Sequence, residues 1–354
     1  MFEQHDRLSE VNTGLSLWAF AVRRLDELGL AGGLREIGKP IERVIHRSAD
    51  GKTLGDVGVA PLSARIGVPS YEVHRSKLQL LLAEALGHDS IGFGARCVAV
   101  RQDEEAAEAD LENGETAKAD LLIGADGVHS VVRGAVPFAS TMQLRRTEIG
   151  VWRGIAPVDQ EEVPTGVHIR VMGPATLFGL ARVSDELVRW YAAAPFPKRR
   201  PSSHTDHRQT ALDIFGAWPP PVPNTLLATA DADHLFNDTP HAPPLRSWGH
   251  GRITLLGDAA HASVPTLGIS AGLAIEDASV LAECLHAAGC DPAGLRAYEA
   301  QRRRVAARVV RSARLFGRVL MIQRQPAYRL RQIGTRLAPQ ALAIRWLVHG
   351  TKWR

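Results

Sequence analysis

Apolar residues recur along the chain at two different spacings, which together predict a mixture of helices and strands. Residues 17–30 carry apolar side chains at helical spacing and end at a cluster of glycines, so this stretch predicts a helix. Residues 41–59 alternate between apolar and polar and contain the turn sequence Ala49-Asp50-Gly51, which predicts a hairpin. A further helix is predicted over Arg75–Leu86, and strands over residues 91–100 and 109–111.

Two almost fully apolar strands stand out later in the chain, at residues 120–125 and 252–256. Parallel sheets bury such strands on both faces, so an α/β core is predicted. A helix over residues 268–288 follows the second strand. Between these two strands, residues 147–194 form several short strand-like runs, which indicate a separate antiparallel sheet.

The composition is that of a globular protein without structural metal or disulfides. The 354 residues are 45% apolar, enough for a sizeable core in one large domain or two. The three cysteines (Cys97, Cys284 and Cys290) lack the spacing of a disulfide framework or a zinc site, so we predict no metal and a cytoplasmic location. No apolar run approaches the roughly 20 residues that cross a bilayer.

The charge is distributed unevenly along the chain. Residues 301–354 contain thirteen arginines, one lysine and no acidic residue, although the net charge is only +4. Val305, Val309, Phe316 and Leu320 recur at helical spacing, which favours a helix packed on the body with its arginines outward. Contact with an anionic membrane surface is an alternative. Nucleic-acid binding is disfavoured because interleaved aromatic residues and a known binding motif are lacking.

Two strand-to-loop junctions carry the clearest chemical signal. In LLIGADGVHSVVR an apolar strand runs into Asp126-Gly127, and in ITLLGDAAHASVPTLGISAGLAIEDA another runs into Gly257-Asp258. Ligands of open α/β sheets bind where strands end, and glycine there lets a large ligand approach the backbone. The small residues that follow Pro265 leave main-chain amides free at the start of a helix. We interpret His261 as a packing residue, and Glu276 and Asp277 as residues that hold local structure.

Together with YEVHRSKLQLLL, these motifs resemble the single-component FAD-dependent monooxygenases of the aromatic-hydroxylase superfamily. The resemblance covers nearly the whole chain and continues through VWRGI and LRAYEAQRRRVAARVV in the family's order. The phrase FGAWPPPV followed by the second junction is most similar to the urate hydroxylase and zeaxanthin epoxidase branch.

The resemblance implies a role for each matching residue. Asp258 would bind the ribityl chain of FAD, Gly257 would let the cofactor approach, and Arg75 would pair with the pyrophosphate, which Asp126 and Gly127 would adjoin. The remaining cofactor-binding positions implied are Glu3 at the adenosine ribose, the main chain of Cys97 at adenine, and Pro265, Gly268, Ile269, Ser270 and Ala271 along the isoalloxazine ring. Weaker substrate candidates are Trp152, Arg153 and Leu177.

The sequence departs from the family at two places. The family usually has Gly-Gln-Gly-Ala where this chain has Gly268-Ile269-Ser270-Ala271, which bears on substrate class and rate. The family also opens with a strand, a GxGxxG turn and a helix, whereas FEQHDRLSEVNTGLSLW matches the sequence after the second strand. We therefore expect an N-terminally incomplete FAD domain, and weak or absent FAD binding if the chain is used as written.

The fold implied is α/β, a Rossmann-like three-layer β/β/α domain with an inserted antiparallel substrate domain and C-terminal helices. The segments expected are residues 1–37, 71–142 and 245–300 for FAD, 38–70 and 143–244 for substrate, and 301–354 for the basic helices.

The implied activity uses NADH or NADPH and O2 to insert one oxygen atom into an electron-rich aromatic, polyketide-like, enol or alkene small molecule through a flavin C4a-hydroperoxide. The protein would contribute no catalytic side chain of its own. The alternatives are another flavoprotein chemistry, such as that of a halogenase or an oxidase, or an inactive remnant that acts as a binding protein.

Overall fold

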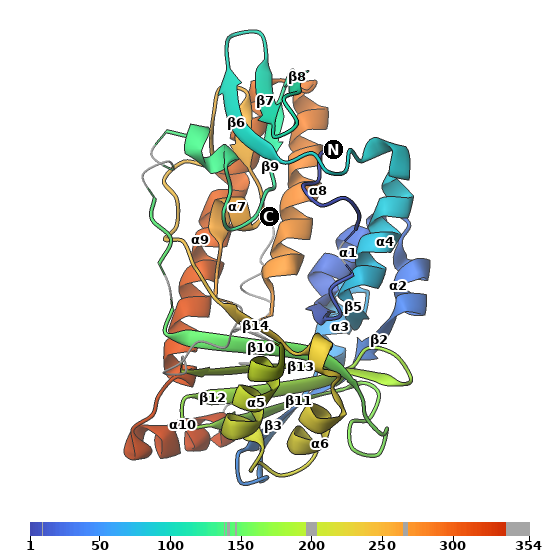
Figure 1. Ribbon diagram of the computed structural model, residues 1–354, viewed down its shortest axis with the longest axis vertical. Coiled ribbons are helices and arrows are strands. Elements are labelled where there is room, and N and C mark those ends of the chain that lie inside the picture. Colours follow the sequence, from blue (N-terminus) through green and yellow to red (C-terminus); the bar gives the residue numbers. More distant parts are fainter. Residues whose placement is uncertain are drawn as a thin grey trace. The chain divides into compact units, whose positions relative to one another are not determined.

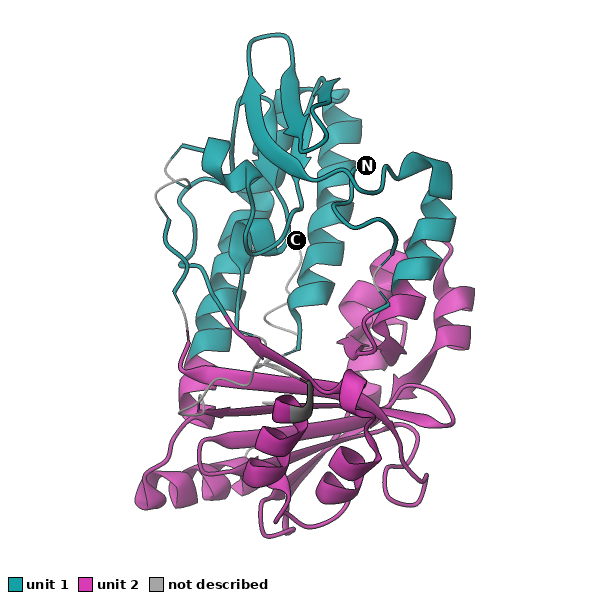
Figure 2. Ribbon diagram, in the orientation of Figure 1, with its two compact units in different colours: residues 1–10, 79–146, 240–314 teal, residues 11–78, 147–239, 315–354 magenta. Residues whose placement is uncertain are grey.

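The structure is a computed structural model that describes residues 1–8, 10–137, 139, 142–145, 147–195, 204–264 and 268–337. The chain divides into two compact units, each built from separate stretches of sequence (Figure 2). Unit 1 comprises Met1–Glu10, Gln79–Arg146 and Pro240–Arg314, and unit 2 comprises Val11–Leu78, Thr147–Thr239 and Leu315–Arg354. The roles expected for the individual segments stay predictions.

The described part of unit 1 contains two small sheets and all or most of four α-helices (Figure 1). One sheet has the order β15-β16-β9 (Gly249–His250, Ile253–Leu255 and Leu122–Gly124), and the other has the order β6-β7-β8 (Cys97–Gln102, Ala107–Leu111 and Thr116–Ala119). The helices are most of α4 (Arg75–Leu86), α7 (Asp258–His261), α8 (Ser270–Ala288) and most of α9 (Pro292–Leu320). Strand β9 runs parallel to β16, as their apolar sequences predicted.

Unit 2 is built on a seven-stranded sheet of order β14-β10-β13-β12-β11-β3-β4. The strands are β3 (Arg43–Ser48), β4 (Thr53–Gly58), β10 (Ile149–Pro157), β11 (Val167–Gly173), β12 (Thr176–Arg182), β13 (Leu187–Pro195) and β14 (Leu235–Asp238). The hairpin predicted at residues 41–59 is confirmed as β3–β4, and the antiparallel sheet predicted at residues 147–194 as β10–β13. The β3–β11 pair is parallel, which joins the hairpin to that sheet.

A second sheet and several helices complete unit 2. The sheet has the order β1-β5-β2 (Gly14–Leu17, Ser70–His74 and Gly38–Ile41). The helices are α1 (Ala19–Glu27), α2 (Ala31–Ile37), α3 (Ala60–Ile66), α5 (His204–Phe215), α6 (Val222–Ala228) and α10 (Gln325–Leu337). The helix predicted at residues 17–30 corresponds to α1, which is shorter and begins at Ala19. Leu17 is instead the last residue of β1. The boundary between the units falls within α4 (Arg75–Leu86) and near the end of α9.

The core of unit 2 lies between the seven-stranded sheet and helices α5 and α6, which cover one face of that sheet (Figure 1). Trp152, Phe178, Trp190 and Phe215 are at most 1% exposed, and Phe178 stacks on Trp190 with ring centroids 5.4 Å apart. Because side chains alternate along a strand, the neighbouring residues of each strand face the other way. The two faces of the sheet can thus serve different purposes.

The basic C-terminal segment begins as predicted, with a long amphipathic helix. Val309 and Leu320 of α9 are buried, which confirms the packed face. The prediction that the arginines point outward was wrong for Arg302, which is 1% exposed because buried carboxylates bind it. None of the helices among the described residues has the length and hydropathy that a membrane span requires.

Candidate functional site

The two glycine–aspartate junctions lie at the same edge of the parallel strand pair β9–β16. Gly124 pairs in register with Leu255, so the two strands end side by side. The loops that contain Asp126-Gly127 and Gly257-Asp258 therefore begin at the same edge, at the carboxyl ends of β9 and β16. The structure brings together two motifs that lie about 130 residues apart in sequence.

The side chain of Asp126 is directed at its own loop. One carboxylate oxygen, Oδ2, accepts hydrogen bonds from the amides of Val131 at 2.7 Å and Val132 at 3.1 Å, and the other accepts from the Ser130 hydroxyl. These contacts satisfy the free amides at the start of a 3₁₀ turn (η2, Val132–Ala135). Asp126 therefore fixes the loop in which the half-buried Gly127 lies.

The second junction presents an exposed carboxylate on a tight turn. Gly257 adopts φ +60°, a conformation that L residues rarely adopt, and a Cβ there would lie 3.3 Å from the side chain of Ala274. Asp258 follows as the first residue of α7, with its side chain exposed to solvent. The local geometry therefore favours glycine at position 257.

The start of α8 offers main-chain donors next to this junction in sequence. Gly268 adopts φ +63° with open space where a side chain would lie, and Ile269 provides no side-chain cap for the first turn. The hydroxyl oxygen of Ser270 lies 3.1 Å from that of Ser263, and Ala271 is half-buried. Pro265 lies outside the described residues.

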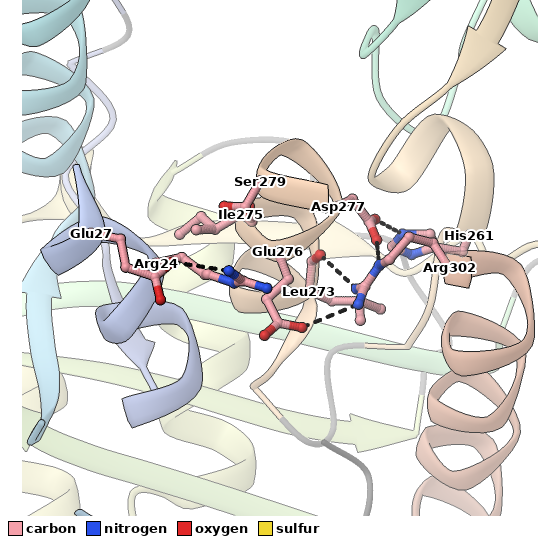
Figure 3. A network of polar contacts seen from close by, with 9 residues as sticks. All are labelled: Arg24, Glu27, His261, Leu273, Ile275, Glu276, Asp277, Ser279 and Arg302. Carbon is pink, nitrogen blue, oxygen red and sulfur yellow. Dashed lines mark hydrogen bonds and ion pairs between the residues drawn. The ribbon is translucent and has the colours of Figure 1, made fainter. Parts of the chain in front are cut away.

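A buried network supports both the second junction and α8 (Figure 3). Asp277, 0% exposed, accepts hydrogen bonds from the Nε of Arg302 at 2.6 Å and contacts Nε2 of His261 at 2.5 Å. Arg302 also donates to Glu276 at 3.2 Å and to the carbonyl oxygen of Leu273 at 3.4 Å. The interpretation of His261, Glu276 and Asp277 as structural residues agrees with these contacts.

Sequence reasoning missed Arg302 because no local pattern links it to Asp277, 25 residues earlier.

Glu3 and Cys97 lie on strand-like backbone in unit 1. The amide of Glu3 donates to the carbonyl oxygen of Gly92 at 2.8 Å, and its carbonyl accepts from Ala95 at 2.8 Å. Its carboxylate accepts from the amide of His5 at 2.9 Å. Cys97 begins β6, and burial raises the pKa of its thiol. The thiol therefore stays protonated, which agrees with a role in which the main chain of Cys97, and not a reactive thiolate, contacts the cofactor.

In unit 2, the positive charges of Arg75 and Arg153 repel each other. Arg75 is exposed at the first position of α4, and its amide donates to the carbonyl oxygen of Thr13 at 2.8 Å. Burial and then the charge of Arg75 lower the pKa of the Arg153 guanidinium. Arg153 donates to the side chain of Asn237 at 2.8 Å. Two neighbouring guanidinium groups favour an anionic ligand.

The two other substrate candidates are buried on opposite faces of the seven-stranded sheet. Trp152, 0% exposed, packs against Phe215 and Phe236 in the core under α5 and α6. Leu177, 2% exposed, belongs to a cluster on the face that also carries Arg153. We retain Arg153 and Leu177 as the candidates for the substrate face.

Comparison with known proteins identifies the family of the chain. A family model described as "FAD binding domain" matches residues 1–313, which is most of the sequence. The chain belongs to this family. The resemblance to FAD-dependent monooxygenases and the α/β fold that it implied are therefore confirmed, and so is FAD as the cofactor of the family.

Several relatives of this flavoprotein are FAD-dependent enzymes. It is 31% identical to the aurachin C monooxygenase/isomerase of Stigmatella aurantiaca over 302 residues, 85% of this chain and 78% of the relative. It is 29% identical to a FAD-dependent urate hydroxylase of Klebsiella pneumoniae over 304 residues, 85% and 79% of the respective chains. The crystal structure of Klebsiella pneumoniae HpxO complexed with FAD and uric acid superimposes with a TM-score of 0.92 at 26% identity, covering 99% of this chain and 89% of that one.

The residues at the junctions fit a large dinucleotide. Gly127 and Gly268 both have positive φ and, among the described residues, no atom within 4 Å of where a side chain would begin, so their backbones have room for a ligand. A carboxylate such as that of Asp258 is able to accept hydrogen bonds from hydroxyl groups, and main-chain amides at the start of α8, which has no side-chain cap, are able to donate them. The residues present therefore suit a cofactor with both a polyhydroxy chain and an electron-rich ring edge.

Within the described parts of the chain, no group of three or more potential metal ligands is present.

Proposed function

We propose that this flavoprotein is an NAD(P)H-consuming monooxygenase that oxidises a small, electron-rich organic substrate. The observation that carries the proposal is the meeting of the Asp126-Gly127 and Gly257-Asp258 junctions at one sheet edge, in a chain of the FAD-binding family. The names of the relatives, which include several monooxygenases and hydroxylases, support the same reaction type.

Each cofactor-binding role follows from the chemistry of the residue. Asp258 would accept hydrogen bonds from the ribityl hydroxyls, and the amides of residues 268–271 would donate to the ring edge. Arg75 would pair with the pyrophosphate, Glu3 would bind the adenosine ribose, and the main chain of Cys97 would lie at adenine. FAD, when bound, would accept a hydride from NAD(P)H and activate O2, so that one oxygen atom enters the substrate and the other leaves as water.

The protein itself needs no nucleophilic side chain for this reaction. Its residues hold the substrate and the cofactor in position and exclude water, which would otherwise divert activated oxygen to hydrogen peroxide. The fixed loop of Asp126 and the buried Asp277–Arg302 network provide the rigidity that such positioning demands.

The first experiment is a titration of the purified chain with FAD, followed by visible absorption, and then assays of NADH and NADPH oxidation with a panel of aromatic substrates under ¹⁸O₂. We expect FAD binding that is weak but saturable, substrate-stimulated oxidation of one nicotinamide donor and a product carrying one labelled oxygen atom. Hydrogen peroxide without labelled product would instead indicate an oxidase-like flavoprotein. Failure to bind FAD would contradict the proposed function and favour a binding protein.

A further inference from the structure

Helix α10 packs against the protein with its polar face. It lies on β4, the edge strand of the seven-stranded sheet, and a Cβ on Gly55 of that strand would lie 3.6 Å from the carbonyl oxygen of Thr335 (Figure 1). The Tyr328 hydroxyl donates to the carbonyl oxygen of Met172 at 3.3 Å, and the side-chain amide of Gln332 donates to the Tyr328 hydroxyl at 2.7 Å. Because Tyr328, Gln332 and Thr335 recur at helical spacing, polar contacts hold one face of α10 on the sheet.

Arg331 fixes the position of α10 further. Its guanidinium donates to the carbonyl oxygens of Gly173 at 2.7 Å and Leu320 at 2.5 Å. The same group lies over the ring of Tyr328, 5.0 Å from the centroid. The helix is therefore tied both to the sheet and to the end of α9, and the same side of it always faces the solvent.

The solvent-facing side of α10 is apolar. Leu330, Ile333 and Leu337 are 69%, 51% and 76% exposed. Their spacing of three and four residues places them on one face of the helix, opposite Tyr328 and Gln332. A helix on a protein surface ordinarily buries its apolar face, so α10 has the reverse orientation. We call Leu330, Ile333 and Leu337 the apolar stripe.

Positive charge borders the apolar stripe. Arg329 and Arg336 are exposed and lie seven residues apart, which places both along one side of the stripe. The sequence contains no acidic residue after Glu299. The two carboxylates of the hairpin β3–β4, against which α10 packs, are each paired with a basic residue of the same hairpin. The stripe is therefore bordered by arginines whose charge these carboxylates do not neutralise.

This combination of charge and apolar surface fits an anionic membrane better than a second copy of the chain. In a symmetric dimer the same patch would meet itself, and the arginines of the two copies would repel each other. A bilayer with anionic phospholipids offers phosphates to the arginines and acyl chains to the stripe. The 13 residues of α10 are fewer than the roughly 20 that cross a bilayer, so the helix would lie along the surface.

We propose that α10 binds the surface of a membrane that contains anionic phospholipids. The apolar stripe inserts at the boundary between headgroups and acyl chains, and Arg329 and Arg336 bind headgroup phosphates. The polar contacts that hold α10 on the sheet involve none of these five side chains, so the helix binds without leaving the protein. The inference is independent of the proposed monooxygenase function, because it uses no residue of the glycine–aspartate junctions.

The test is co-sedimentation of the full chain with two kinds of vesicle, one of phosphatidylcholine alone and one of equal parts phosphatidylcholine and phosphatidylglycerol. We expect binding to the anionic vesicles to be roughly 25-fold tighter, about fivefold from each of Arg329 and Arg336. Added salt should weaken this binding, because it screens the charges at the membrane surface.

A pair of leucine substitutions tests the stripe without changing the charge. Leu330→Gln combined with Leu337→Gln should weaken binding to the anionic vesicles at least about tenfold, because less apolar surface is buried in the bilayer. The control is Leu227→Gln, which changes an exposed leucine of α6 in the same unit. It should bind as the unmodified chain does.

A pair of arginine substitutions tests the charge. Arg329→Gln combined with Arg336→Gln should remove most of the preference for anionic over neutral vesicles. Arg65→Gln should keep it, because Arg65 is an exposed arginine of α3, away from the stripe.

Three outcomes would overturn the proposal. Equal binding to the two kinds of vesicle, including binding to neither, would contradict the role of anionic lipid. Unchanged binding by the leucine variant would show that another part of the chain contacts the membrane. Self-association in sedimentation equilibrium without lipid, abolished by the leucine substitutions and accompanied by no vesicle binding, would assign the stripe to an interface between copies of the chain.

Discussion

Asp258 shows how much of the site depends on one residue and its immediate neighbour. The backbone of Gly257, at φ +60°, places Asp258 at the first position of α7 with its carboxylate exposed at the end of β16. The carboxylate of Asp126 accepts hydrogen bonds from the amides of Val131 and Val132 in its own loop. Asp258 is the junction aspartate that we expect to bind hydroxyl groups of the cofactor.

Replacing Asp258 should weaken FAD binding without unfolding the protein. We expect Asp258→Ala to reduce the affinity for FAD by roughly tenfold to a hundredfold, the value of hydrogen bonds to a charged group. The measurement is FAD titration followed by absorption, with Asp89→Ala as the control because Asp89 is also exposed in unit 1. Equal affinities of both variants and the unmodified chain would remove Asp258 from the site.

At the scale of elements, the Asp277–Arg302 network holds three helices together. His261 comes from α7, Glu276 and Asp277 come from α8, and Arg302 comes from α9. Each contact is buried, so water cannot replace a lost partner. The start of α8 and the Gly257-Asp258 junction therefore depend on a cation supplied by α9, from a residue 25 positions beyond Asp277 in the sequence.

Removing that cation should be strongly destabilising. We expect Arg302→Met to lower the free energy of unfolding by about 3–5 kcal/mol, because it removes the buried cation that binds two buried carboxylates, Glu276 and Asp277. Chemical denaturation measures the change. Arg304→Met on the exposed side of α9 is the control and should alter stability by less than about 0.5 kcal/mol. A small effect of Arg302→Met would mean that the network contributes little to stability.

For the whole molecule, the buried ionisable groups of unit 2 set the response to acid. Burial lowers the pKa of His168 to about 4 and that of His46 to about 3, from an ordinary value of 6.5. Burial alone would raise the pKa of Glu72, but the charges of Arg189 and His168 outweigh it and lower the pKa to about 2. All three groups favour the deprotonated form in the folded state.

Stability should therefore fall as the pH decreases. Below about pH 6.5, His46 and His168 become protonated in the unfolded chain, whereas the folded chain keeps them neutral. Below about pH 4.5, Glu72 likewise becomes protonated in the unfolded chain before it does so in the folded chain. Thermal unfolding between pH 7.5 and 4 measures this loss. His46→Asn should flatten the dependence between pH 6.5 and 4, whereas an unchanged slope would show that His46 is not held neutral by the fold.

The sequence by itself determined the elements, the family and the cofactor class. Apolar strands that end in glycine–aspartate pairs are local patterns, because the backbone of a tight turn at a ligand site demands glycine at that very position. Helix α4 and the hairpin β3–β4 were likewise predictable from short-range periodicity and turn residues. The strand predicted at residues 91–100 begins only at Cys97, because residues 91–96 contain bends and make only an isolated bridge, between Gly92 and Phe2.

The tertiary structure alone decided which distant side chains meet. His46, Arg170, Tyr191 and Arg153 come from four strands, and only the register of the sheet aligns them. The burial of Arg302 likewise depends on carboxylates of another helix. Such contacts leave no local signal, because pairing across strands and helices is set by packing of the whole sheet and not by neighbouring residues in the chain.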